Sequence, residues 1–295
     1  MATVDTAAPA PRMGESPASR VLRWVGKAPV HLILIFVGVL WLVPTLGLFL
    51  TSTLGAEDFQ DEGWWQIFSE PSKLTFENYE SVFDNEDITS ALVTTVLISI
   101  GGTLLPIAVA AFAGYAFAWL DFPGRDWLFI LVVALLVVPL QMALIPIFDL
   151  YNRVGLFDTV LGLVLFHTAF GLPFAIFLLR NFFIGIPKDL MEAARIDGAS
   201  ELRIFLRVVL PLGLPAIASL AIFQFLWTWN DLLVALTFGR DTQPITVAIF
   251  SQLRAFSTTI DLIAPATFVS LAIPLVVFFA FQRYFVQGLL AGSVK

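Results

Sequence analysis

The sequence predicts an all-α membrane protein with six transmembrane helices and both termini in the cytoplasm. Three observations lead to this prediction: a hydrophobic fraction of 58%, a charged fraction of only 13%, and six long apolar segments. Soluble domains carry about 25% charged residues, so the outer surface of this chain has to face lipid. The net charge of −7 argues against a nucleic-acid partner, which requires a basic surface. The absence of cysteine excludes disulfides and thiolate metal sites.

A helix needs about 20 mostly apolar residues to cross a bilayer. Six segments meet this condition, at 30–50, 89–119, 127–149, 158–180, 212–236 and 264–285. The first is longer than the roughly 7–15 apolar residues of a cleavable signal, so we expect it to remain as a span. Residues 1–28 are rich in Ala, Pro, Ser and Arg and are expected to form a mobile cytoplasmic tail. The six-helix domain then covers residues 29–295.

Lysine and arginine predict the orientation, because they favour the cytoplasmic side of a membrane. With both termini inside, the cytoplasmic segments carry twelve of these residues and the outer segments carry four. The loop at 51–88 then lies outside, with ten acidic residues and one lysine. A solvated acidic loop and a short surface helix near 75–79 both remain open for it.

The loop at about 181–211 is the most informative segment, and the charge count places it in the cytoplasm. Pro187 suits the first position of a short helix. Gly198 predicts the end of that helix, because glycine readily adopts a positive φ. Ser200 can cap a second short helix, which Pro211 ends. The periodicity alone favours an amphipathic helix that rests among lipid headgroups, which is the commoner fate of such segments.

The spacing Glu192-Ala193-Ala194-x3-Gly198-x9-Val208-x-Leu210-Pro211 resembles the EAA loop of binding-protein-dependent ABC importers. Val208 stands where the family usually carries Ile, and it keeps the β-branched apolar character. The likeness covers about residues 30–295 and extends to the MalG-like membrane subunits of maltose-type importers. Further matching stretches are found at 177–183, 186–187, 196–199, 229–231 and 288–295.

The resemblance implies the transmembrane domain of an ABC importer, of the MetI-like type, in a bacterial cell (inner) membrane. It implies a MalF-like second permease subunit, a MalK-like ATPase dimer, and an extracytoplasmic sugar-binding protein. The substrate would be a sugar, with a weak preference for an α-glucoside. The sequence contains no G-x-x-x-x-G-K-[ST] motif for phosphate binding, so the energy is expected from the partner ATPase. We expect no catalytic residue, cofactor or metal.

Two neighbouring alanines make one face of the first short helix narrow, so that another protein can approach it closely. By the resemblance, Glu192 would accept hydrogen bonds from the ATPase and Arg195 would pair with a carboxylate there, although both side chains can instead be solvated surface charges. The residues expected to couple the chain to the ATPase are Glu192, Ala193, Ala194, Arg195, Asp197, Gly198, Leu210 and Pro211.

Polar side chains also occur in or near the apolar segments, where they are costly and often functional. The candidates for the substrate path are Gln141, His167, Gln224, Asn230 and Asp231. Sugar hydroxyls need amide and carboxylate partners beside aromatic faces, which Phe225, Trp227 and Trp229 can supply. The alternative is structural: such groups tie helices together or cap them.

Two other functions compete with an ATP-driven importer. A secondary transporter driven by an ion gradient would often show internal repeats and charged residues at mid-membrane, and neither is evident here. An intramembrane enzyme would need a group of catalytic residues at membrane depth, and the sequence contains no such motif.

Overall fold

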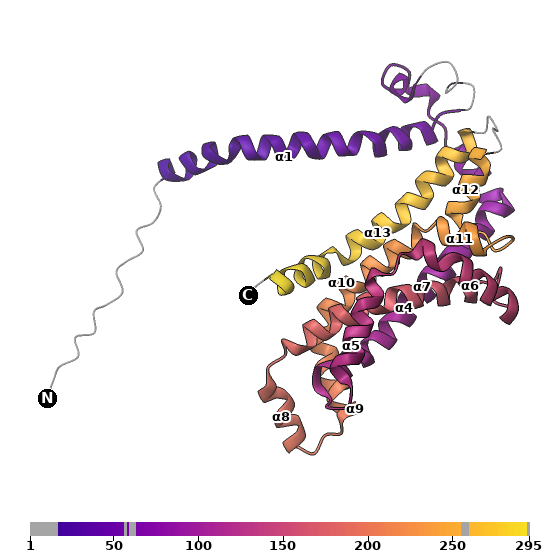
Figure 1. The fold of residues 1–295 in the computed structure, drawn as a ribbon. Coiled ribbons are helices and arrows are strands. Elements are labelled where there is room, and N and C mark those ends of the chain that lie inside the picture. Colours follow the sequence, from indigo (N-terminus) through magenta and orange to yellow (C-terminus); the bar gives the residue numbers. More distant parts are fainter. Residues whose placement is uncertain (1–16, 56–57, 59–62, 255–259, 294–295) are drawn as a thin grey trace.

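The structure is a computed structural model that describes residues 17–55, 58, 63–254 and 260–293. Nearly all of these residues are helical, with a single isolated bridge between Leu54 and Leu74 among them, so the all-α prediction is confirmed (Figure 1). The elements are α1 (Pro17–Ser52), η1 (Trp64–Phe68), η2 (Pro71–Lys73), α3 (Glu77–Asp84), α4 (Glu86–Trp119), α5 (Arg125–Ala134), η3 (Leu135–Val137), α6 (Leu140–Val154), α7 (Val160–Ile184), α8 (Lys188–Ile196), α9 (Glu201–Ile204), η4 (Phe205–Val209), α10 (Leu210–Trp229), α11 (Leu233–Phe238), α12 (Ile245–Arg254) and α13 (Ile260–Ser293).

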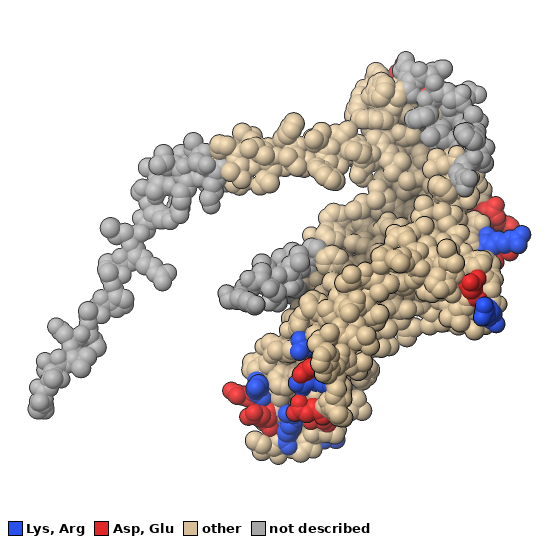
Figure 2. All heavy atoms as spheres, in the orientation of Figure 1, with Lys and Arg blue, Asp and Glu red and all other residues tan. Residues whose placement is uncertain are grey.

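Five helices in the described part of the chain are long and apolar enough to cross a membrane, and a bent pair makes six if it is counted as one span. The five run over Ala28–Ser52, Glu86–Trp119, Val160–Ile184, Glu201–Trp229 and Asp261–Tyr284. Figure 2 shows the charged side chains gathered at the α8–α9 end and beside α6, with a broad uncharged surface between them. This distribution is the one expected of a multi-pass membrane protein.

The centre of the bundle is formed by α4 and α7, with α10 packed against both. Small residues on α4 let α7 approach closely, because Ala110 and Gly114 are both buried in the bundle. A Cβ atom on Gly114 would lie 3.1 Å from the backbone nitrogen of Arg180. Small residues four apart are a common means of close helix packing in membranes.

Helix α1 extends away from the bundle over most of its length (Figure 1), and its apolar window is almost wholly exposed. Its near end packs against α13. The helix begins at Pro17 and therefore includes residues 17–28, which the sequence assigned to the tail. The remaining tail residues, 1–16, lie outside the described residues.

The third predicted span, 127–149, is not one straight helix. Its two parts, Arg125–Val137 and Leu140–Val154, meet at an angle of 100°. Pro139 explains the break, because proline has no N–H and disfavours helical geometry in the residue before it. Val138 accordingly adopts extended angles, with φ −68° and ψ 116°. The apolar pattern continued through Pro139, so it concealed the bend.

The fifth predicted span, 212–236, is displaced toward the N-terminus. The continuous helical segment begins at Glu201, and it ends at Trp229. The expectation that Pro211 separates a short helix from this span was wrong. The π-helical turn η4 lets the N–H of Leu210 bond to the carbonyl of Phe205, and this wider turn accommodates Pro211 within the helix.

The side of the bundle opposite α8 is held by Asp158, which joins the loop after α6 to the loop after α11. Its carboxylate accepts backbone hydrogen bonds from Arg240, Asp241 and Thr242 at 2.8, 3.0 and 2.8 Å. Burial acts to raise the pKa of Asp158, but the hydrogen bonds outweigh burial and lower it. Asp158 has a φ of 57°, unusual for a residue other than glycine.

Candidate functional site

Helix α8 projects from the end of the bundle opposite α11 and α12 (Figure 1). Pro187 precedes it with extended angles, and Asp189 lies in its first turn, where the helix dipole favours an acid. Met191 is the buried residue of the helix, at 0% exposure, and it joins the apolar core that contains Ile204 and Phe205. The helix is therefore attached along one narrow stripe.

The remaining surface of α8 is open. Leu190 is 45% exposed and Ile196 is 86% exposed, although both are apolar. Glu192 and Ala193 are also exposed, whereas Ala194 is half-buried against the core. Charged residues of both signs gather at this end of the molecule (Figure 2). A helix with exposed apolar residues beside charged ones is suited to contact with another protein.

Gly198 ends α8 in the predicted left-handed conformation, with φ 75°. The N–H of Gly198 bonds to the carbonyl of Arg195 at 3.0 Å, and the N–H of Ala199 bonds to the carbonyl of Ala194 at 3.0 Å. This pair of bonds is a Schellman motif, which fixes the direction of the chain after the helix. Nothing lies within 4 Å of a Cβ built on Gly198, so its φ rather than crowding favours glycine here.

The chain then enters α9, and it continues without a break into α10. Ser200 is the residue before α9, as predicted, but its side chain makes no capping hydrogen bond. Leu210 packs partly buried against the core, and Pro211 is exposed in the first turn of α10. Every residue expected to couple to the ATPase is therefore on α8, at its bend, or at the start of α10.

A chain of polar contacts connects α8 to the bundle. Arg195 Nε donates to Glu201 Oε1 at 3.0 Å, and the hydroxyl of Tyr115 donates to Glu201 Oε2. The hydrogen bond to Glu201 raises the pKa of Arg195 further, so the guanidinium stays charged. Tyr115 belongs to α4 and is 4% exposed. We call these three residues the α8 anchor.

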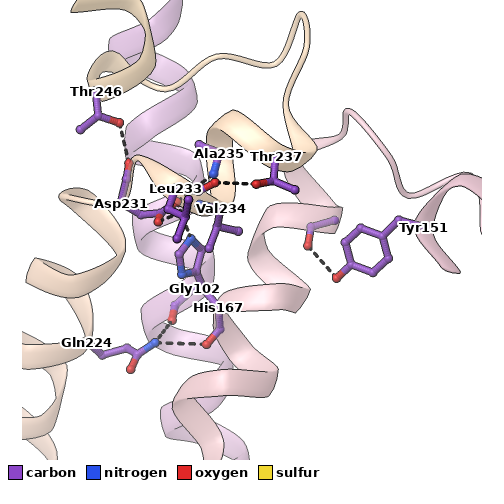
Figure 3. A network of polar contacts seen from close by, with 11 residues as sticks. Gly102, Tyr151, His167, Gln224, Asp231, Leu233, Val234, Ala235, Thr237 and Thr246 are labelled. Carbon is purple, nitrogen blue, oxygen red and sulfur yellow. Dashed lines mark hydrogen bonds and ion pairs between the residues drawn. The ribbon is translucent and has the colours of Figure 1, made fainter. Parts of the chain in front are cut away.

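The predicted polar residues within the membrane fall into two groups. His167, Gln224 and Asp231 are brought together where α4, α7, α10 and the start of α11 meet (Figure 3). Gln141 is exposed in the first turn of α6, and Asn230 donates to the carbonyl of Leu226 in its own helix at 2.8 Å. The structure thus joins three of the five candidates.

Gln224 completes the hydrogen bonding of α4. Pro106 has no N–H, so the carbonyl of Gly102, four residues earlier, has no helical donor. Gln224 Nε2 lies 2.9 Å from that carbonyl oxygen, and it is also 3.4 Å from the carbonyl of His167 on α7. Gly171 makes room for this amide, because a Cβ there would lie 2.6 Å from Nε2. Side chains of neighbouring helices often supply such missing bonds in membranes.

His167 and Asp231 form a buried pair between α7 and the turn before α11. His167 Nε2 lies 3.6 Å from Asp231 Oδ2, and the histidine is 1% exposed. The carboxylate of Asp231 also accepts from the backbone N–H groups of Val234 and Ala235 at 3.2 and 3.0 Å, and so caps α11. Asp231 therefore has a local structural role as well as its contact with His167.

An aromatic groove runs between α7 and α10. It has a volume of about 230 Å³, and it is lined by Phe170, Gly171, Phe174, Leu220, Phe223, Gln224 and Trp227. Of the predicted aromatic residues, Trp227 faces this groove, whereas Trp229 is buried and donates to the carbonyl of Ser270 at 3.0 Å. Aromatic faces beside an amide match the chemistry of a sugar ring.

Sequence reasoning missed several of these features. Phe170 and Phe174, like Phe223 and Trp227, are four residues apart, and this spacing places each pair on one helix face. That signal was available. No comparable signal pointed to Glu201 and Tyr115, which are 86 residues apart and meet only in the fold.

Residues 107–291 match the family described as binding-protein-dependent transport system inner membrane component. The chain is 47% identical over 275 residues to the osmoprotective compounds uptake permease protein GgtD of Synechocystis sp., covering 91% of this chain and 92% of that protein. It is 49% identical over 233 residues to the alpha-glucoside transport system permease protein AglG of Rhizobium meliloti, covering 76% of this chain and 61% of AglG. A chain of a bacterial ABC transporter that imports alginate superposes with a TM-score of 0.71 at 22% identity, covering 92% and 99% of the two chains.

Proposed function

This chain belongs to the family of binding-protein-dependent transport system inner membrane components, and from this we propose that it is a permease subunit of an ATP-driven sugar importer. In this role it forms half of the translocation pathway, beside a second, related permease subunit. An ATPase dimer supplies the energy, and an extracytoplasmic binding protein delivers the sugar. The observation that carries the proposal is the exposed, firmly attached helix α8.

Helix α8 has the properties that a coupling element needs. Its exposed apolar residues, Leu190 and Ile196, offer contact area to the ATPase, and Glu192 offers a carboxylate. The Schellman motif at Gly198 keeps the helix at a fixed angle to the chain that follows it. Leu210 and Pro211 continue this connection into α10, so a displacement of α8 by the ATPase moves a membrane-spanning helix. In this arrangement both termini and α8 lie on the cytoplasmic side.

The transported molecule is proposed to be an α-glucoside or a related small sugar. The likeness to an alpha-glucoside permease supports this substrate class. The aromatic groove supplies stacking faces from Phe174 and Trp227, and Gln224 supplies an amide beside them. His167, Asp231, Asn230 and Gln141 complete the proposed path, in which the buried His167–Asp231 pair acts by holding α7 against α11.

Reconstitution of the assembled transporter tests this function. The chain is purified in mild detergent together with its copurifying partners, and the complex is placed in liposomes with the binding protein. We expect uptake of a radiolabelled α-glucoside that requires ATP on the α8 side and is insensitive to a proton uncoupler. Uptake that stops with the uncoupler, or proceeds with this chain alone, would establish a secondary transporter instead.

A further inference from the structure

We infer that Glu201 is a positioning residue that transmits the movement of α8 to α4 as well as to α10. The inference rests on the proposed function, since it concerns how the same importer is driven. Covalent connection already links α8 to α7 and, through the bend at Gly198, to α9 and α10. The chain provides no such direct link to α4. Tyr115, the residue of α4 that contacts Glu201, is 86 residues away from it in the sequence.

The α8 anchor supplies this missing link. Each carboxylate oxygen of Glu201 has a separate partner: Oε1 accepts from Arg195 on α8, and Oε2 accepts from Tyr115 on α4. A carboxylate held from both sides fixes the distance between the two helices more closely than one contact would. Hydrogen bonds to charged groups are also stronger than those between neutral groups.

The two ends of the anchor differ in burial, and this difference gives it a direction. Arg195 and Glu201 have side-chain exposures of 40% and 45%, so they can move with α8. Tyr115 is 4% exposed, and its ring packs against Phe205 with centroids 5.3 Å apart. The tyrosine is therefore a fixed point on α4, and a displacement of the carboxylate bears directly on that helix.

Helix α4 is suited to receive this movement, because the contact between α4 and α7 is the most extensive between any two elements in the described residues. Movement of α4 therefore carries α7 with it. The aromatic groove lies between α7 and α10, and the chain itself connects α8 to both of these helices. The anchor adds a second route to α7, which runs from α8 through Glu201 and Tyr115 to α4.

Tyr115→Phe tests the inference, because it removes the hydroxyl and preserves the buried ring. We expect the complex to assemble and to hydrolyse ATP, while sugar uptake per ATP hydrolysed falls about tenfold, the factor that corresponds to the loss of one hydrogen bond to a charged group. Glu201→Met, which keeps the length of the side chain but removes both acceptor oxygens, should give a loss of the same order. Combined with Tyr115→Phe it should add little, because both changes break the same link.

Tyr151→Phe is the matched control. Tyr151 is also a buried tyrosine, and its hydroxyl donates to the carbonyl of Gly162 at 3.0 Å, far from α8. This variant should keep the normal uptake per ATP. Unchanged uptake per ATP in both Tyr115→Phe and Glu201→Met would overturn the inference, as would a loss of uptake matched by an equal loss of assembled complex. A wild-type complex without ATP-dependent uptake would instead refute the proposed function.

Discussion

Replacing Gln224 by methionine should destabilise the bundle, and a second substitution should remove most of this effect. Methionine has nearly the volume of glutamine, so the change chiefly deletes the donor 2.9 Å from the carbonyl of Gly102. A buried carbonyl left without a partner costs about 1–3 kcal/mol. At roughly 2 °C for each kcal/mol in a chain of this size, the midpoint of thermal unfolding in detergent should fall by about 2–6 °C.

The second substitution is Pro106→Ala, which restores a backbone N–H four residues after Gly102. That N–H can donate to the same carbonyl, so Gln224→Met should cost little in the Pro106→Ala background. The comparison uses four proteins: the wild type, both single variants and the double variant. Gln141→Met is the control, because Gln141 is exposed. An equal loss of stability in both backgrounds would show that Gln224 stabilises the bundle by some other means.

Three further predictions concern α8 and the opposite end of the molecule. Gly198→Val should reduce uptake at least tenfold while the protein stays in the membrane, because a positive φ costs a residue with a side chain about 1–2 kcal/mol, and more when that side chain is β-branched. Gly155→Val is the control that should transport normally, because Gly155 has a φ of 74° and equally free space around it. Glu192→Lys should lower the yield of copurified ATPase, and an undiminished yield would count against direct contact. Asp158→Asn should lower the unfolding temperature at pH 7. The pKa of Asp158 is lowered in the folded state, so the ionised carboxylate stabilises the fold at pH values above the unfolded pKa near 3.8, and this stabilisation is lost as the pH falls from there through the folded pKa. The difference in unfolding temperature between Asp158→Asn and the wild type should therefore shrink in acid. A difference that does not change with pH would contradict this.

The apolar segments could be predicted from the sequence because composition over 20 residues decides whether a helix can face lipid. Their shapes could not. Pro139 and Pro211 both lie in or beside apolar segments, yet the first produces a bend of 100° and the second is accommodated by a π-helical turn. Which outcome occurs depends on the partners available to the released carbonyl groups, and those partners come from the tertiary structure.

The local conformation of α8 and of the bend after it was easier to predict than the contacts of the polar residues within the spans, for a similar reason. The end of α8 depends on the local conformation of Gly198, and a glycine after a short amphipathic helix is a local signal. The role of Gln224 depends on Pro106, which lies on another helix. A polar residue within a span therefore indicates that a partner exists, but the sequence leaves open whether that partner is a substrate or a backbone group.

The contacts of α4 at Tyr115 and Gly102 also explain how the part of the helix nearest α8 and its middle part can move together. Tyr115 and Gly102 are thirteen residues apart, which corresponds to about 20 Å along the helix. Between them Pro106 removes one backbone hydrogen bond, and a helix with a missing bond bends more easily at that point. Gln224 restores a donor to the free carbonyl and joins it to α10. A displacement applied at Tyr115 can then reach the groove through a helix that is held at its weakest turn, so the same amide that stabilises the bundle also limits how far α4 bends when α8 moves.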